Sequence, residues 1–187
     1  MPLDITLPDV PPIIPSARYD DDIVQQLQLD FDSKLPWLDR AYHIARVGII
    51  SKDELSYPQI QANNDSNEHF DIRPDNQIGA YCFFEVESPY IPDFNDREVE
   101  YFLSVVFWGN LKIIDGATTT DFTSQLIQDV VKRLSRFDAA GVSVEERPEL
   151  IFDKYSGLTQ EKNQFLLRKY TAFKITFSIK SDLTNDC

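Results

Sequence analysis

The sequence predicts an α+β fold: a mixed or antiparallel sheet of four to five strands, flanked by two main helices and preceded by an extended N-terminal arm. Three observations predict it. One segment is apolar on both faces of a strand, two segments repeat apolar residues at helical spacing, and strand-like runs follow one another instead of alternating strictly with helices. We expect one α+β domain over residues 19–187, with the arm over residues 1–18.

The composition suits a single domain. The chain has 187 residues, of which 42% are hydrophobic and 12% aromatic. A chain of this size buries roughly two thirds of its unfolded surface. It has no run of about 18 apolar residues that would span a membrane, and no cationic and then apolar start typical of a secretion signal. We therefore expect a protein made in the cytoplasm, without a membrane partner.

The charge balance limits the possible partners. The formal net charge of -13 argues against sequence-independent binding to nucleic acid, because that affinity comes from Lys and Arg neutralising phosphates. It does not argue against a surface that DNA slides past, since an acidic wall repels DNA. The two cysteines, Cys82 and Cys187, predict neither a disulfide framework nor a zinc cluster.

The arm over residues 1–18 holds five of the eleven prolines, so it cannot form a helix or a central strand. It is also too apolar for an inert linker. It lies either on its own domain or on a neighbouring subunit, and the sequence leaves both open. The aliphatic residues of the arm are candidate subunit-interface residues: Ile5, Leu7, Val10, Ile13 and Ile14.

The first helix is predicted over residues 19–35. Three aspartates, at 20–22, stand at its start, where negative charge is favoured, and Pro36 ends it. The aspartates are interpreted as a solvated first turn and not as a metal site, because successive helical positions point in different directions. The apolar residues at four-residue spacing are Ile23, Leu27, Phe31 and Leu35.

A strand is predicted over residues 41–50, with His43 as an ordinary strand residue. Residues 52–78 are polar and rich in turn formers, which predicts a long loop. The acidic and amide residues of this loop lack the glycine and closing glutamate of a calcium-binding EF-hand loop. His69 has no nearby His or Cys, so a metal role is not expected for it.

The next strand is predicted over residues 78–88, followed by a proline-bounded loop. Tyr90, Ile91 and Phe94 in this loop are candidate interface anchors, or else they form a lid over the local core. The central strand follows over residues 99–108. Its side chains are apolar on both faces, apart from Ser104, so both faces must be covered.

After the central strand, the sequence predicts that Gly109 and Asn110 bend the chain and that the strand resumes through Ile114 to a turn at Asp115-Gly116. A helix then has Thr120 or Asp121 as its N-cap. Its apolar stripe consists of Phe122, Leu126, Ile127, Val130, Val131 and Leu134. Towards the C-terminus, we expect one strand near residues 149–152 and a half-exposed antiparallel strand over residues 170–180, in which apolar and polar residues alternate.

Motifs for common chemistry are missing from the sequence. The six glycines form neither GxGxxG nor a P-loop, and there is no GxSxG, HExxH or CxxC. Glu85 and Glu87 share one strand face, which we interpret as the wet side of a sheet edge. We expect no enzyme, no cofactor and no metal. An enzyme of unfamiliar type that uses Glu85, Glu87 or His43 remains an alternative.

Three stretches carry a resemblance to a known class of proteins: LQLDFDSKLPWLDRAYHIARVG, RPDNQIGAYCFFEVESP and YFLSVVFWGNLKII, the last followed by an amphipathic helix. This order resembles small neck or tail proteins of phages and prophages from Bacteroidetes-type hosts, and is similar to the tail-terminator and tail-completion class of head-to-tail connection proteins. The resemblance covers about residues 23–137. The proline-rich arm and the long loop over residues 52–78 depart from a minimal terminator.

The resemblance implies a structural virion protein without an active site, which assembles with itself into a ring of six or more subunits. Its other partners would be connector, portal-side or tail proteins, and DNA would pass through without sticking. Trp37 is a further candidate interface anchor. The acidic residues that could line the passage are Asp138, Glu145, Glu146, Glu149, Asp153 and Glu161. A soluble interaction or assembly-chaperone module outside the particle is the alternative function.

Overall fold

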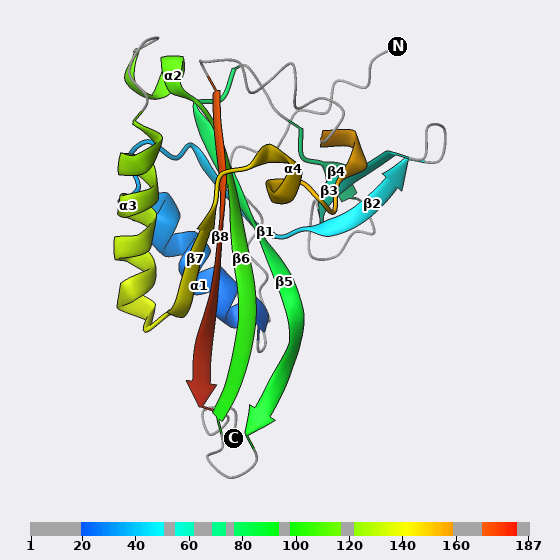
Figure 1. The fold of residues 1–187 in the computed structure, drawn as a ribbon, viewed down its shortest axis with the longest axis vertical. Coiled ribbons are helices and arrows are strands. Elements are labelled where there is room, and N and C mark those ends of the chain that lie inside the picture. Colours follow the sequence, from blue (N-terminus) through cyan, green and yellow to red (C-terminus); the bar gives the residue numbers. More distant parts are fainter. Residues whose placement is uncertain are drawn as a thin grey trace.

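The computed structural model describes residues 20–50, 55–61, 69–73, 77–93, 98–116, 122–158 and 170–182 (Figure 1). The elements in chain order are α1 (Asp20–Lys34), β1 (Arg40–Ile44), β2 (Arg46–Ile50), β3 (Leu55–Gln61), β4 (His69–Asp71), β5 (Ala80–Asp93), β6 (Glu98–Asn110), α2 (Leu111–Asp115), α3 (Thr123–Leu134), the 3-10 turn η1 (Ser135–Phe137), β7 (Ala140–Glu145), α4 (Pro148–Ile151) and β8 (Tyr170–Asp182). The predicted arm, residues 1–18, lies outside the described residues.

The main sheet has five strands in the order β1-β5-β6-β8-β7. β1 runs parallel to β5, and the other neighbours are antiparallel, so the sheet is mixed. This confirms the predicted α+β class. β6 occupies the centre of the sheet, as its two apolar faces predict. A second sheet, which the sequence did not predict, has the order β2-β3-β4.

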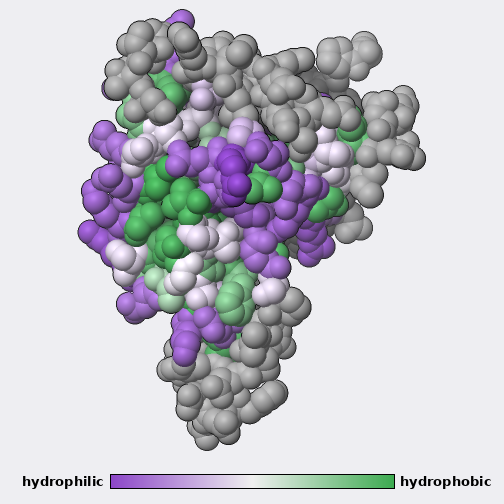
Figure 2. Space-filling model, in the orientation of Figure 1, coloured by the Kyte–Doolittle hydropathy of each residue, from purple (hydrophilic) through white to green (hydrophobic). Residues whose placement is uncertain are grey.

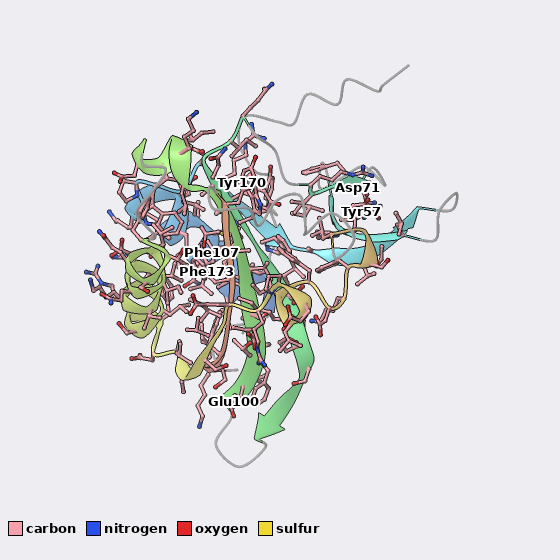
Figure 3. The ribbon with its side chains drawn as sticks, turned by 45° about the horizontal axis from the view of Figure 1, so that its top comes forward. Tyr57, Asp71, Glu100, Phe107, Tyr170 and Phe173 are labelled. Atoms are coloured by element: carbon pink, nitrogen blue, oxygen red, sulfur yellow. The ribbon has the colours of Figure 1, made fainter. Side chains whose placement is uncertain are left out.

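Both faces of the main sheet are covered, and each cover makes a separate core. Helices α1 and α3 pack on one face (Figure 1), where Phe107 of β6 stacks on Phe173 of β8 with ring centroids 4.8 Å apart (Figure 3). The second sheet and the α4 segment cover part of the other face. There Trp108 stacks between Tyr81 and Tyr170, with centroids 5.4 Å from each. The central strand therefore supplies adjacent aromatic residues to two different cores.

The two long helices agree with the predicted apolar stripes. Ile23, Leu27 and Phe31 of α1 are buried against the sheet, and Leu35 just beyond it is buried too. In α3 the buried face consists of Thr123, Leu126, Val130 and Leu134. Arg133 Nε donates to Asp30 Oδ2 over 2.6 Å, which ties α3 to α1. The predicted N-caps of α3, Thr120 and Asp121, lie outside the described residues.

The prediction of one strand over residues 41–50 is wrong. The chain leaves the main sheet at Ala45, whose backbone N–H donates to Phe84 O over 2.8 Å, and β2 then enters the second sheet. The predicted loop over residues 52–78 contains β3, which pairs antiparallel with β2, and β4, which pairs antiparallel with β3. These strands carry many polar residues, and among the described residues the second sheet buries few apolar side chains. These are Tyr57, Ile60 and Phe70, with Ile72 directly after β4.

The prediction of a loop after residue 88 is also wrong. The strand β5 continues to Asp93, with irregular pairing between Val86 and Ile91. β1 pairs only with residues 81–84 of β5, and proline is tolerated where one side of a strand has no ladder to donate to. Tyr90 and Ile91 belong to this strand, but their side chains, like the whole of Phe94, lie outside the described part of the chain.

Residues 111–115 form the helix α2 and not the predicted continuation of a strand. Asn110 caps the helix, with its side-chain oxygen accepting from Lys112 N at 3.2 Å. Gly116 ends it in the left-handed conformation, with φ of 65°. The apolar residues Leu111 and Ile114 suggested a strand, but their spacing also suits one turn of helix, and the cap at each end decides between the two.

The last part of the chain brings two further corrections. The strand expected near residues 149–152 is the helix α4, which has Pro148 in its first turn, and a strand precedes it as β7. The final strand, β8, is antiparallel as predicted, but it is not half-exposed. Lys174 is only 8% exposed, because it lies in a polar cluster on the sheet face opposite α1 and α3.

Candidate functional site

Polar residues gather on the main sheet, on the face opposite α1 and α3. The register places Glu85 of β5 opposite Ser104 of β6, and Ser104 opposite Thr176 of β8. Lys174 precedes Thr176 by two residues, so its side chain points to the same face. Lys154 reaches this group from the chain segment after α4. We call Glu85, Glu87, Ser104, Lys154 and Lys174 the charged cluster.

In the charged cluster, each of the two lysine ammonium groups forms ion pairs with both glutamate carboxylates. Lys174 Nζ lies 2.8 Å from Glu85 Oε2 and 2.6 Å from Glu87 Oε1. Lys154 Nζ lies 3.1 Å from one oxygen of each glutamate. Ser104 Oγ is closer to Glu87 Oε1, at 2.6 Å, than to Glu85 Oε2, at 3.2 Å, so its single proton is donated to Glu87. The four charges sum to zero.

The surroundings fix the protonation of these groups. Partial burial raises the pKa of Glu87, but the hydrogen bonds from Lys174 and Ser104 outweigh it and lower the pKa to about 2. Burial lowers the pKa of Lys174, and the charge of Glu85 overcomes this and raises it. Both groups are therefore charged at neutral pH. Tyr155 beside them has its pKa raised, first by burial and then by the charge of Glu85.

This arrangement suits a structural clamp better than proton transfer. A general acid or base works best with a pKa near the operating pH, whereas the pKa of Glu87 is far below it and that of Lys174 far above. The interpretation of Glu85 as a wet edge residue is wrong, since it is 2% exposed. The sequence held a sign of this at Glu85, which interrupts the apolar run from Ala80 to Val86. It held none at Lys174, because polar and apolar residues alternate along that strand.

The segment from Phe152 to Leu158 fastens the second sheet to the main sheet. Ser56 of β3 and Ser156 each donate a backbone N–H to the other's hydroxyl, at 2.9 Å and 2.8 Å. Gly157 lies against the ring of Tyr57, so close that a Cβ there would be 2.3 Å from a ring carbon. Lys154 in the same segment binds the main sheet through the charged cluster. We call residues 152–158 the strap.

The two histidines belong to strands of different sheets. His43 is buried in β1 of the main sheet, and His69 begins β4 of the second sheet and is exposed. Within the described residues, no group of three or more His, Cys, Asp or Glu side chains could hold a metal ion. Cys82 is buried, and the burial raises the pKa of its thiol.

The predicted lumenal acids lie around β7, α4 and the strap. Asp138 precedes β7, and Glu145 ends it. Glu145 accepts from Arg147 at 2.8 Å and 2.6 Å, and these hydrogen bonds lower its pKa to about 2. The other members that are described are exposed: Asp138, Glu146, Glu149 and Asp153. Glu161 lies outside the described residues.

Strand β7 is the second notable feature, because it is an edge of the main sheet. Among the described residues no strand pairs with its outer side. Val142 is 38% exposed and Val144 is 42% exposed. Figure 2 shows a green, hydrophobic area over β7 with purple, hydrophilic surface around it. Gly141, at φ of 61°, sits where the register of β7 shifts against β8, which indicates a bulge.

The predicted anchor Trp37 packs against the core of its own chain. It is partly buried, and its ring lies 5.7 Å from that of Phe107, centroid to centroid. Its Nε1 atom is buried and finds no hydrogen-bond partner in the part of the chain that the structure describes. Trp37 therefore packs against its own core on one side, and its role as an interface anchor stays a prediction.

Comparison of the chain with known protein families, with characterised proteins and with solved structures finds no match. Within the described residues, no helix combines the length and the apolar character needed to cross a membrane. Any functional conclusion must therefore come from the residues of this chain and their arrangement.

Proposed function

We propose that this protein is a structural virion protein, made in the host cytoplasm, that forms a ring at the head-to-tail junction of a phage. It acts as a tail terminator or as a neck or connector ring, joins the tail to the capsid connector, and lines the passage of the DNA. The observation that carries the proposal is the exposed edge strand β7, whose two valines offer an apolar surface on an otherwise charged face. Such an edge pairs readily with another chain.

The charge distribution supports a passage for DNA. Asp138, Glu146, Glu149 and Asp153 are exposed around β7 and α4, and the whole chain carries a formal net charge of -13. A surface of this sign repels phosphates, so DNA would move past without being retained. The charged cluster supports the proposal in a different way, because its ion pairs brace the sheet that would carry the load between neighbouring rings.

Self-association is the property to test first, by light scattering on the full chain and on a chain that lacks residues 1–18. We expect the full chain to have the mass of a ring of six or more subunits, and the shortened chain to lose it. Electron microscopy of the same sample should show closed rings. A monomer in both samples, at the highest concentration that the protein tolerates, would contradict self-assembly. It would favour a soluble interaction or assembly-chaperone module, which purified virions would lack.

A further inference from the structure

The main sheet has two edges, and they differ in how they are closed. At the β1 edge, α1 packs nearby, and Gln28 Nε2 donates to the backbone oxygen of Ala41 over 2.8 Å. At the β7 edge, no described strand or side chain takes the outer backbone groups, and every residue from Ala140 to Val144 is exposed. An open edge of this kind presents free N–H and C=O groups to an added strand.

The exposed valines favour an added strand of a certain pattern. Val144 is in register with Ile175 of β8, so it lies on the face that carries α1 and α3. Val142, two residues earlier, points to the same face. A strand beside β7 would bury these valines if it carried apolar residues at every second position. The register of β7 against β8 shifts between Ala140 and Ser143, which leaves residues 143–145 as the regular stretch, so a short strand suffices.

The N-terminal arm contains one such segment. Leu3, Ile5 and Leu7 alternate with Asp4 and Thr6. Proline stands directly before this segment and directly after it, which limits a strand to these five residues because proline has no N–H to donate. The segment is thus long enough to pair with the regular stretch of β7, and in a strand all three of its apolar side chains would lie on one face.

The linker between this segment and α1 is long enough to reach a neighbouring subunit. Residues 8–19 include prolines at 8, 11, 12 and 15, and proline-rich linkers act as extended, semi-rigid spacers. Fully extended, they span roughly 40 Å, about the diameter of a domain of this size. A stiff spacer of that length would let residues 3–7 reach the β7 edge of a neighbouring subunit.

We propose that residues 3–7 of one subunit add as a strand to the β7 edge of the next subunit. The inference rests on the proposed function and names its subunit contact. The contact is between two different surfaces, donor arm and acceptor edge, so every subunit gives one and accepts one. A heterologous contact of this kind closes into a ring when the rotation between subunits permits.

Disulfide trapping between two different chains tests the contact directly. All chains carry Cys187→Ser, so that the buried Cys82 is the only native thiol left. One chain then carries Ile5→Cys and the other Val144→Cys, and the two are mixed and oxidised. We expect a covalent heterodimer. The matched control replaces Val144→Cys by Val47→Cys, at the edge of the second sheet, where Val47 is 52% exposed, and should give none.

Light scattering on charge variants separates this inference from the ring proposal. Val144→Lys should weaken self-association about tenfold, because it places a charge in the apolar contact, whereas Val47→Lys should leave the mass unchanged. A ring that survives Val144→Lys and gives no heterodimer overturns the strand addition but not the ring. A wild-type chain that stays monomeric overturns both. A chain with both cysteines that only closes on itself shows an intramolecular arm and also overturns the inference.

Discussion

Single residues of the charged cluster show how burial changes the meaning of a sequence pattern. Glu85 and Glu87, two residues apart, suggest a polar edge, and Lys174 suggests the wet side of an alternating strand. In the structure Glu85 and Lys174 are buried, and the lysine binds both glutamates. Buried charges are tolerated only when they are paired. Glu85 can therefore be buried because the lysine neutralises its charge, and the lysine can be buried because the glutamates neutralise its charge.

Removal of one member should leave an uncompensated charge. We expect Lys174→Met to lower the free energy of unfolding at neutral pH by about 3–5 kcal/mol, because Glu85 would stay buried with one partner fewer. The pKa of Glu87 is about 2 in the folded protein, against an ordinary value of 4.5, so its stabilising contribution is present above pH 4.5 and is lost as the pH falls towards 2. Without Lys174 this pH dependence should flatten.

Urea unfolding at a series of pH values measures both effects. Lys132→Met is the control, because that side chain is 71% exposed and its ion pair with Asp129 lies on the surface of α3. We expect this change to cost less than about 1 kcal/mol. Wild-type stability of Lys174→Met, or an unchanged slope between pH 4.5 and pH 2, would show that the cluster does not brace the sheet.

Among the elements, the strap is the segment that connects the second sheet to the main sheet. Ser156 and Gly157 of the strap contact Ser56 and Tyr57 of β3. Lys154 of the strap contacts the charged cluster of the main sheet. Short elements such as β4 and α4 bury little surface by themselves. Their stability therefore comes from the segments that cover them, and the strap covers two sheets at once.

Gly157→Ala tests the close approach of the strap to β3. The new Cβ would meet the ring of Tyr57 at 2.3 Å, so the ring or the strap must move. We expect a loss of about 1–3 kcal/mol, as for other overpacked sites, measured by chemical denaturation. In a double-mutant cycle with Tyr57→Ala the combined loss should be smaller than the sum, because the smaller side chain leaves room for the methyl group. If the losses in unfolding free energy of the two single variants simply add, the methyl group of Gly157→Ala does not clash with Tyr57, and the prediction is wrong.

At the scale of the whole molecule, the main sheet is covered on both faces, while one of its edges remains open. Helices α1 and α3 complete one core, and the second sheet with the α4 segment completes the other. Open edges are a hazard for soluble proteins and are usually blocked. Net charge of one sign opposes association, so an edge meant for assembly has to overcome the mutual repulsion of acidic subunits.

Ionic strength should therefore favour assembly. Each subunit carries a formal net charge of -13. Raising the ionic strength from about 0.01 M to about 1 M shortens the Debye length from roughly 30 Å to roughly 3 Å and screens the repulsion. We expect the oligomer mass from light scattering to increase or to persist at lower protein concentration. The chain without residues 1–18 is the control and should not respond. Dissociation in high salt would indicate that ion pairs drive the contact.

The elements predicted correctly are those with long, regular patterns. β6 shows apolar residues on both faces from Tyr101 to Trp108, apart from Ser104, and α1 and α3 repeat apolar residues at helical spacing, so local sequence was sufficient. The second sheet was missed because β3 and β4 are short and polar. α2 and α4 were expected as strands, because one turn of helix and a short strand have nearly the same apolar pattern, and the caps decide between them.

The fold class, the central strand and the two long helices follow from local sequence, since they depend on how side chains repeat along one element. The charged cluster of Glu85, Glu87 and Lys174, the joining of two sheets by the strap, and the edge of β7 that no described strand covers follow only from the three-dimensional packing. The physical reason is distance along the chain. Lys174 lies far from Glu85 in sequence, and Ser156 far from Ser56, so the register between strands and the packing of the strap create contacts that no local pattern contains.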